Sequence, residues 1–275
     1  MSGNTDCSVK NSYGVFPDRS TCRAANVAYP TSEAELVSIV AAATKAGRKM
    51  RVTTRYSHSI CEDCDNLMNN IPTLECTDGT DGLFISTKFL NHMVQSDATA
   101  MTLTVESGMT LRQFIDESAK VGLALPYAPY WWGLTVGGMM GTGAHGSSLR
   151  GKGSAVHDYV TEIRMVTPGS ANDGFAKVRV LSETTTPNEF NAARVSLGVL
   201  GVISQVTFEL QPMFKRSLTY LMKDDLDFDD QDPIFGGIHE FADLVWLPSQ
   251  GKVVYRMDDR VAKNLERVSS SCSGT

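Results

Sequence analysis

The sequence has no excess of positive charge. Its 25 Lys and Arg residues are outnumbered by 31 Asp and Glu residues, which gives a formal net charge of −6 at pH 7. No local cluster of basic residues offsets this balance. Nucleic acids and anionic membrane surfaces attract basic proteins, so we expect neither of them as a partner.

A long hydrophobic run is also missing. A membrane-spanning helix needs roughly 18 consecutive apolar residues, whereas the apolar stretch 195–203 is short and interrupted by two glycines. The first residues, Met1 to Asp6, contain neither the basic nor the apolar region of a secretory signal. The sequence therefore predicts no transmembrane segment and no signal peptide as written, and it leaves the compartment open.

Cysteine is sparse, with six residues in a chain of 275. Cys7 and Cys22 enclose a polar, turn-rich segment that has little core of its own. This arrangement favours a disulfide from an oxidising compartment and a pair of free thiols about equally. We therefore treat Cys7 and Cys22 as a candidate disulfide.

The chain does contain enough apolar material for a sizeable core. Its composition, 42% hydrophobic and 20% charged residues, is typical of a globular protein. Capping boxes at Ser32–Glu35 and Thr110–Gln113, each followed by helical periodicity, predict helices near 32–46 and 110–121. A third helix is predicted near 186–197, where it is expected to bury Phe190, Ala193, the stem of Arg194 and Leu197. Alternating stretches between these helices predict strands, so the chain is expected to form two lobes of mixed helix and sheet up to about residue 212.

The most distinctive stretch spans residues 125–148. It has six glycines between Gly133 and Gly146, preceded by the adjacent Trp131 and Trp132. Glycine lets a ligand approach backbone N–H groups closely, so the stretch predicts a site for a large, partly anionic cofactor. A glycine-rich turn without a ligand is the alternative, and at least one of the two tryptophans is expected to fill core.

Three segments resemble the vanillyl-alcohol-oxidase type, or PCMH type, of FAD-binding domain. Residues 30–59 are similar to its pyrophosphate-binding segment, and residues 191–212 to its third flavin segment. The second flavin segment has the pattern VGGxxxTGxHGS, which stands here as Val136-Gly137-Gly138-Met139-Met140-Gly141-Thr142-Gly143-Ala144-His145-Gly146-Ser147. Within the family, Arg55-Tyr56-Ser57-His58-Ser59 and Tyr127-Ala128-Pro129-Tyr130-Trp131-Trp132-Gly133 are similar to the plant L-gulonolactone oxidase group, which are aldonolactone oxidases associated with ascorbate synthesis.

The resemblance implies an α+β fold with a small βαβ lobe and a larger α+β lobe. The implied division is a Cys-containing segment 1–26, an FAD-binding domain 27–212 with lobes of about 27–90 and 91–212, the beginning of a cap domain 213–262, and a flexible tail 263–275. Family members continue with a large cap domain that ends near an HWxK motif, and this chain contains no HWxK. The cap is therefore expected to be truncated.

The resemblance also implies which residues bind FAD. His58 matches the histidine that carries a covalent flavin link in many relatives, so it is the candidate for such a link. His145 is expected near the flavin, with a histidine packed on the glycine turn as the alternative. No catalytic residue is assigned. The full set of expected cofactor contacts is Thr54, Arg55, Tyr56, Ser57, His58, Ser59, Thr135, Val136, Gly137, Gly138, Gly141, Thr142, Gly143, His145, Gly146, Val202 and Ile203.

The implied reaction is FAD-dependent oxidation of L-gulono-1,4-lactone or a related aldonolactone at C2. Hydride would pass to flavin N5 and on to oxygen or another acceptor, giving L-ascorbate and hydrogen peroxide. Two alternatives remain: a truncated flavin-binding remnant without turnover, and a Cys3His zinc module built from His58, Cys61, Cys64 and Cys76. A single CxxC is a weak signal, so no metal is expected. Relatives are mostly secretory and some are mitochondrial, and the oligomeric state is left open.

Overall fold

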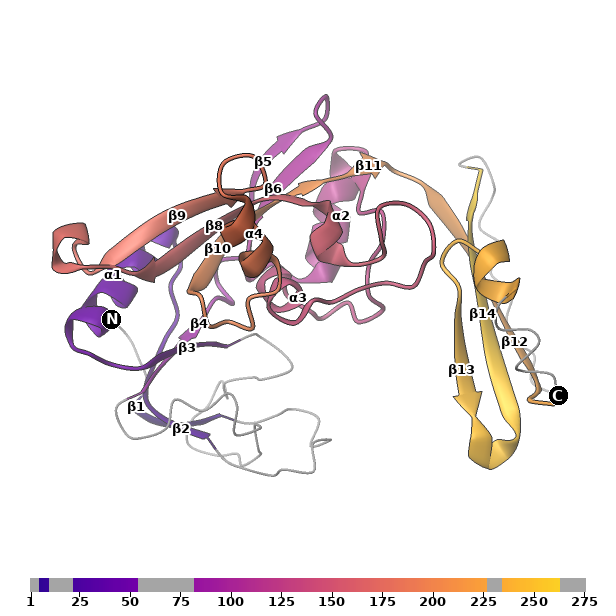
Figure 1. Cartoon of the computed structure of the whole chain (residues 1–275), viewed down its shortest axis with the longest axis horizontal. Coiled ribbons are helices and arrows are strands. Elements are labelled where there is room, and N and C mark those ends of the chain that lie inside the picture. The colour runs from indigo at the N-terminus through magenta and orange to yellow at the C-terminus, as the bar shows by residue number, and fades with distance from the viewer. Residues whose placement is uncertain (1–4, 10–21, 54–81, 227–233, 263–275) are drawn as a thin grey trace.

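The computed structural model describes residues 5–9, 22–53, 82–226 and 234–262 of the chain. In this part of the chain, two sheets carry helices and form the main body, and a third sheet stands apart toward the C-terminal end (Figure 1). A short pairing of β7 (Leu123–Ala124) with β11 (Gln211–Pro212) lies before the chain crosses to that third sheet. No helix within the described ranges is long and apolar enough to cross a membrane.

The first sheet has the strand order β1-β2-β4-β3. Its β2 and β3 both run parallel to β4, which lies between them, and α1 connects β2 to β3 in a βαβ unit. A parallel pair needs such a crossover, and a helix is its usual form. The strands are β1 (Thr5–Val9), β2 (Cys22–Ala28), β3 (Met50–Thr53) and β4 (Leu83–Ser86).

Helix α1 (Glu33–Lys45) begins where the sequence predicts. The Ser32 hydroxyl accepts a hydrogen bond from the Glu35 N–H, which satisfies one of the free donors of the first turn. The expected capping box is not closed on Ser32, because the Glu35 carboxylate instead accepts from the Thr31 N–H at 2.9 Å. Apolar residues at helical spacing, including Leu36, give α1 a buried face.

The second sheet is antiparallel throughout, with the order β5-β6-β10-β8-β9. Helix α2 (Leu111–Lys120) has the predicted capping box between Thr110 and Gln113, and it packs Phe114 against Phe208 of the sheet with ring centroids 4.9 Å apart. Helix α4 (Pro187–Arg194) buries Phe190 and Ala193 as predicted. The strands are β5 (Met93–Asp97), β6 (Thr102–Glu106), β8 (Val160–Pro168), β9 (Ala176–Ser182) and β10 (Val202–Glu209).

The two lobes share one hydrophobic cluster. Leu36 of α1 packs in the same cluster as Val166 of β8 and Val202 of β10, so the helix of the first sheet also covers the second. A bidentate ion pair reinforces this contact, because Arg164 donates to the Glu33 carboxylate at 2.6 and 2.8 Å. The lobe boundary near residue 90 stays a prediction, but the core is continuous across it.

The third sheet has the order β12-β14-β13 and is antiparallel. Figure 1 shows it projecting from the main body at the right. All ten residues of β12 are exposed, as are all five residues of the edge strand β5 in the second sheet. The strands are β12 (Lys215–Asp224), β13 (Asp243–Leu247) and β14 (Lys252–Val261).

Two expectations about apolar side chains are wrong. Leu197 is 65% exposed instead of buried, because α4 ends at Arg194 and the chain then turns away with a left-handed φ of 51° at Leu197. Neither tryptophan fills core: Trp131 is 53% and Trp132 is 55% exposed. The Arg112 guanidinium stacks over the Trp132 ring at 4.8 Å, so this aromatic surface is held by an exposed cation instead of by core packing.

Candidate cofactor site

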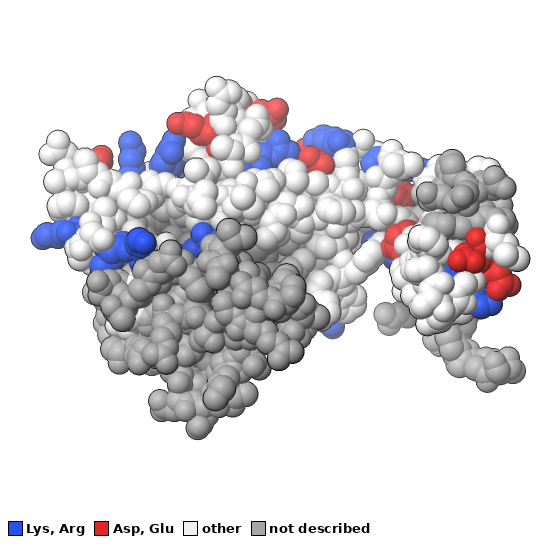
Figure 2. All heavy atoms as spheres, turned by 60° about the horizontal axis from the view of Figure 1, so that its bottom comes forward, with Lys and Arg blue, Asp and Glu red and all other residues white. Residues whose placement is uncertain are grey.

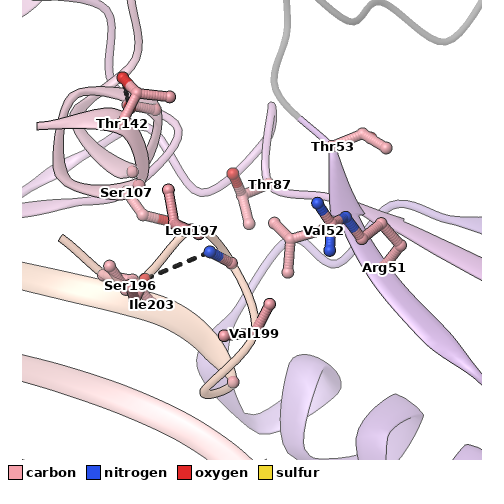
Figure 3. A pocket seen from close by; sticks show the side chains of 15 residues that line it. Arg51, Val52, Thr53, Thr87, Ser107, Thr142, Ser196, Leu197, Val199 and Ile203 are labelled. Atoms are coloured by element: carbon pink, nitrogen blue, oxygen red, sulfur yellow. Dashed lines mark hydrogen bonds between the residues drawn. The ribbon is translucent and has the colours of Figure 1, made fainter. Parts of the chain in front are cut away.

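A cavity of about 360 Å³ lies where the two lobes meet. Three described segments surround it: the end of β3, the helix α3 (Val136–Thr142) with Ser107 beneath it, and the loop of residues 196–201 that leads into β10 (Figure 3). The lining residues are Arg51, Val52, Thr53, Thr87, Ser107, Gly137, Gly138, Gly141, Thr142, Ser196, Leu197, Gly198, Val199, Gly201 and Ile203. A concave, largely apolar lining with a few polar groups is typical of a cofactor site.

Glycine is required at two places in this wall because other backbone comes so close. The Gly137 N–H donates to the Ser107 carbonyl at 2.7 Å, and a Cβ at Gly137 would lie 3.2 Å from that oxygen. Gly201 has φ +146°, and a Cβ there would lie 2.7 Å from the Val166 carbonyl oxygen. Gly137 therefore lets α3 approach the backbone of Ser107, and Gly201 lets the chain before β10 approach the backbone of Val166. These close contacts form walls of the cavity.

The loop of residues 196–201 forms the rim of the cavity. Leu197 and Gly198 both have left-handed φ values, 51° and 69°, so the chain makes a tight turn over the opening. The Leu197 N–H donates to the Gly141 carbonyl at 3.0 Å, and the Gly198 N–H donates to the Ser196 hydroxyl at 3.4 Å. The first bond holds the rim against α3 and the second lies within the loop, and Leu197 and Val199 remain exposed there.

Two residues of the lining have buried hydroxyls without a partner. The Thr53 and Ser107 side-chain oxygens are shielded from solvent, and neither has a hydrogen-bond partner in the described part of the chain. A buried hydroxyl without a partner costs roughly 1–3 kcal/mol. Because both residues line the cavity, this pair is a structural sign that the cavity is built for a ligand with polar groups.

The structure places the expected contacts unevenly. Gly137, Gly138, Gly141, Thr142 and Ile203 line the cavity.

The remaining expected contacts of the second and third segments support the wall from behind. The buried Thr135 caps α3 by accepting from the Gly138 N–H at 3.1 Å, and Gly143 ends α3 in the left-handed conformation. Val136 and Val202 are buried in the hydrophobic clusters. A Cβ at Gly146 would lie 3.0 Å from the Ala128 carbonyl oxygen, so this glycine permits a close backbone contact.

His145 does not line the cavity. Its Nδ1 lies 2.7 Å from the carbonyl oxygen of Gly146, which matches the alternative of a histidine packed on the glycine turn. The neighbouring His157 is also absent from the lining. Burial lowers the pKa of His157, with Asp158 opposing that shift and the Arg194 cation adding to it. Neither imidazole is thus placed to exchange a proton with a ligand in this cavity.

Several expected residues lie outside the described ranges. These are the turn Thr54, Arg55, Tyr56, Ser57, His58 and Ser59, together with Cys61, Cys64 and Cys76 of the zinc alternative. No group of three or more metal-ligating side chains occurs among the described residues. Cys7 and Cys22 lie on the paired strands β1 and β2, where Cys7 is opposite Ala24 and Cys22 is opposite Val9, and their disulfide stays a prediction.

Sequence reasoning missed most of the non-glycine lining. Arg51 and Thr53 lie within residues 30–59, the segment similar to the pyrophosphate-binding segment, but are not among the expected contacts. Ser107 and Thr87 had no signal, because single Ser and Thr residues occur throughout the chain. Ser196 and Gly198 lie inside the segment that resembles the third flavin segment, so that resemblance carried a usable signal for the rim.

Gly141, Gly143 and Gly146 have the GxGxxG spacing, but not in the setting of a Rossmann fold. That fingerprint follows a strand and opens a helix, whereas here Gly141 and Gly143 lie at the end of α3 and Gly146 follows it. The cavity is therefore not the phosphate site of a Rossmann fold. The fold and the cavity define a cofactor-binding α+β domain.

Comparison with known proteins agrees with that class. The FAD binding domain family model matches residues 24–171. The chain belongs to this family, and FAD is its cofactor, as the sequence predicts.

Relatives of the chain are named as enzymes that act on L-gulonolactone. The chain is 82% identical over 264 residues to L-gulonolactone oxidase 5 and 81% identical to L-gulonolactone oxidase 2, both from Arabidopsis thaliana. These alignments cover 96% of this chain but 43% of each relative. The L-gulono-1,4-lactone dehydrogenase of Mycobacterium tuberculosis is 31% identical over 199 residues, which cover 72% of this chain and 40% of that protein. The chain thus spans less than half the length of these relatives.

Solved structures confirm the α+β fold. A solvent-stable cholesterol oxidase superposes with a TM-score of 0.72 at 17% identity, covering 93% of this chain and 48% of the other. The Bermuda grass isoallergen BG60 gives a TM-score of 0.68 at 17% identity, covering 92% of this chain and 50% of the other. At this identity the likeness concerns the fold alone.

Proposed function

We propose that this chain is the FAD-binding part of an oxidoreductase that oxidises L-gulono-1,4-lactone, or a related aldonolactone, at C2 to give L-ascorbate. The observation that carries the proposal is the 82% identity to L-gulonolactone oxidase 5, which extends over 264 residues and so includes the segments around the cavity. FAD, when bound, supplies a hydride acceptor for the carbon that is oxidised.

The residues of this chain bind and shield the cofactor. Thr53 and Ser107 offer hydroxyls to its polar groups, and the backbone around Gly137 and Gly138 leaves room for close contact. Val52 and Ile203 give the cavity apolar walls that exclude water. The glycines and small polar residues thus account for binding and orientation.

The proton of the lactone hydroxyl needs a different group. General-base catalysis requires a titratable side chain within hydrogen-bond reach of that proton. The described lining contains no carboxylate and no imidazole, and its one charged side chain, Arg51, is no base. We therefore assign no catalytic residue to this cavity and propose that the base belongs to the substrate side of the enzyme.

The absorbance spectrum of the purified chain tests the proposal. A flavin spectrum that bleaches when L-gulono-1,4-lactone is added anaerobically, but not when glucose is added, supports it. A flavin spectrum that the lactone leaves unchanged overturns it in favour of a flavin-binding remnant without turnover. Acid precipitation tests whether the flavin is covalently bound. If yellow colour stays with the pellet of the wild-type chain but not with that of His58→Ala, His58 is the attachment point.

The electron acceptor is a separate part of the proposal. Relatives in the comparison are called oxidases in one organism and a dehydrogenase in another. The names therefore support the lactone as substrate more strongly than they support oxygen as electron acceptor. We propose oxygen, on the strength of the higher identity to the oxidases. Lactone-dependent oxygen uptake with hydrogen peroxide formation is the expected result, and turnover that appears only with an artificial dye would contradict it.

A further inference from the structure

Strand β12 lies at an open edge of the C-terminal sheet. In the order β12-β14-β13 it pairs with β14 alone, and no second partner strand occurs in the described part of the chain. All ten of its residues are exposed, and in Figure 1 it lies on the side of this sheet away from the lobes. The strand therefore offers unpaired backbone N–H and C=O groups to another strand.

The features that usually protect an edge strand are missing from β12. It pairs with β14 over its full length without a bulge, and it contains no proline. Its charged residues lie at the two ends, which leaves the stretch 217–222 uncharged. By contrast, the exposed edge strand β5 has only five residues, is irregular in its register with β6 and ends at Asp97. Of these two edges, β12 is the one suited to pairing with a further strand.

One face of β12 is also apolar. Leu218, Tyr220 and Met222 alternate along the strand and so point to the same face, and they are 49%, 63% and 59% exposed. In Figure 2 the acidic and basic side chains of the C-terminal sheet lie together at the right, with uncharged surface beside them. Exposed apolar side chains in a row next to an unpaired edge are typical of an interaction site.

The sequence of β12 is complementary to itself about Tyr220. When two copies pair antiparallel across a two-fold axis, residues at equal distances from the axis face each other. With the axis at Tyr220, Leu218 of each copy faces Met222 of the other, and Arg216 faces Asp224. Apolar residues thus meet apolar residues, and opposite charges meet at both ends.

The neighbouring registers fit less well. A two-fold axis normal to the sheet keeps each face on its own side, so the axis can move only from one residue to the next. An axis at Thr219 would bring Lys215 of each copy opposite Lys223 of the other, and like charges directly opposite are destabilising. An axis at Leu221 would leave residues 215–217 of both strands without a partner in β12. Charge and overlap therefore both favour the axis at Tyr220.

We propose that β12 pairs with β12 of a second copy of this chain, in the antiparallel register centred on Tyr220. The two C-terminal sheets then form one continuous sheet, with a row of apolar side chains across the junction. Because a single strand pair is a small interface, the dimer is weak and depends on concentration. The pairing is independent of the reaction proposed above, because β12 does not line the cavity.

Sedimentation velocity of the purified chain with its FAD tests the proposal. We expect a monomer in dilute solution and a dimer in concentrated solution. Hydrogen exchange should slow with concentration in β12 but not in β5 or β13. Tyr220→Glu places two carboxylates opposite each other and should raise the dissociation constant of the dimer about tenfold or more, whereas Tyr220→Phe should keep the dimer.

Val94→Glu is the matched control. Val94 is a 47% exposed apolar residue of the edge strand β5, so the same charge is added to an edge that is not expected to pair. Within the monomer, Tyr220 is opposite Arg256 of β14, so a carboxylate at position 220 has a cation beside it. Thermal unfolding checks that each variant is folded.

A disulfide tests the register. Directly opposite residues of antiparallel strands are close enough for a disulfide, so mild oxidation of Tyr220→Cys should link two copies through position 220. Peptide mass spectrometry separates this bond from any that the natural cysteines make. Leu218→Cys alone should not link to itself, but it should link to Met222→Cys when the two variants are mixed. Leu218→Cys that links to itself as readily as Tyr220→Cys would contradict the register.

Three results would overturn the proposal: a monomer at every concentration, a dimer that folded Tyr220→Glu retains unchanged, or an equal loss of the dimer in Val94→Glu. In the first case, slow hydrogen exchange in β12 of the monomer would show that another segment covers the edge. In the second case the dimer would use another surface of the molecule.

Discussion

The cofactor lobes and the C-terminal sheet are both built largely from antiparallel strands, yet they are stabilised in different ways. In the lobes, helices cover the sheets and the buried residues are apolar or small and uncharged, as with Phe114 and Phe208. In the sheet of β12, β14 and β13, the buried residues include the ion pair of Arg256, 7% exposed, and Asp258, 2% exposed. Apolar side chains such as Tyr220, 63% exposed, stand instead on the surface.

A network of charges and rings anchors the C-terminal sheet to the lobes. Arg256 donates to Asp243 and to Asp258, each at 2.6 Å, and to the Phe241 carbonyl at 2.9 Å. Its guanidinium also stacks on the Tyr130 ring of the glycine-rich segment at 3.8 Å.

The comparison teaches that the lobes depend on apolar area, whereas the attachment of the sheet combines a few charged groups with the buried ring of Phe241, which packs on Tyr127 of the lobes at 5.2 Å. Buried charges need complete pairing, so this anchor is intolerant of the loss of one partner. An apolar core loses stability in proportion to the atoms that are removed.

The largest expected effect is in the lobes. Phe208→Ala removes a fully buried ring that contacts Phe114, and it should lower the free energy of unfolding by about 3–5 kcal/mol. Chemical denaturation measures this, and hydrogen exchange should show protection lost in α2 and β6. A decrease in the free energy of unfolding below about 1 kcal/mol would mean that this part of the core contributes little to the stability of the lobes.

Asp258→Asn should come next, with a loss of about 3 kcal/mol. It removes the charge that pairs with both Arg216 and Arg256 and leaves their guanidinium groups short of an anion. Hydrogen exchange should rise in β12, β13 and β14 while α1 and β8 stay protected. Lys252→Gln, which breaks the exposed pair with Asp224, is the control and should change stability by less than about 1 kcal/mol. If Asp258→Asn increased hydrogen exchange in α1 as much as in the C-terminal sheet, the lobes and the sheet would unfold as a single cooperative unit. They would then not be stabilised in different ways.

Ser107→Ala separates stability from function. Without ligand, removing a buried hydroxyl that has no partner should stabilise the chain by up to about 1 kcal/mol. The same change should weaken FAD binding by roughly tenfold, because the cofactor loses a hydrogen bond. Ser118→Ala is the control, since the Ser118 hydroxyl already donates to the Phe114 carbonyl and does not line the cavity. Destabilisation of ligand-free Ser107→Ala would show that the hydroxyl has a partner within the protein.

The smallest effect concerns pH, and it should have opposite signs in the two regions. Burial would raise the pKa of Glu33, but hydrogen bonds from Arg164 and Ser204 outweigh it and hold the pKa below the usual 4.5. Its contribution to stability is therefore complete above pH 4.5 and is lost as the pH falls through the lower folded value. Burial, with the charge of Asp258, raises the pKa of Asp243 above 3.8, so protonation there favours the folded sheet.

Acid should thus loosen the contact between α1 and β8 before it loosens the sheet. Hydrogen exchange at pH 4 and pH 6 measures this order. Glu33→Gln should flatten the acid dependence of α1 while the sheet keeps its own. An acid response of α1 that survives Glu33→Gln would assign the effect to other groups.

The sequence predicted the parts of this molecule that depend on neighbouring residues. The Thr110–Gln113 cap and the buried Phe190 followed from spacing along the chain. The cavity did not, because Thr53, Ser107 and Ser196 come from separate segments and only the packing of the lobes brings them together. Leu197 has a helical spacing relative to Phe190, but the helix ends before it, and no local signal distinguishes an exposed rim residue from a core one.

The shared cluster around Leu36 has a consequence for the cavity before the cofactor binds. Since α1 packs on Val166 and Val202, the lobes cannot swing apart without exposing that cluster to water. The described parts of the lobes are therefore held together independently of the cofactor, so the cavity between them is preformed, with Leu197 exposed at its rim.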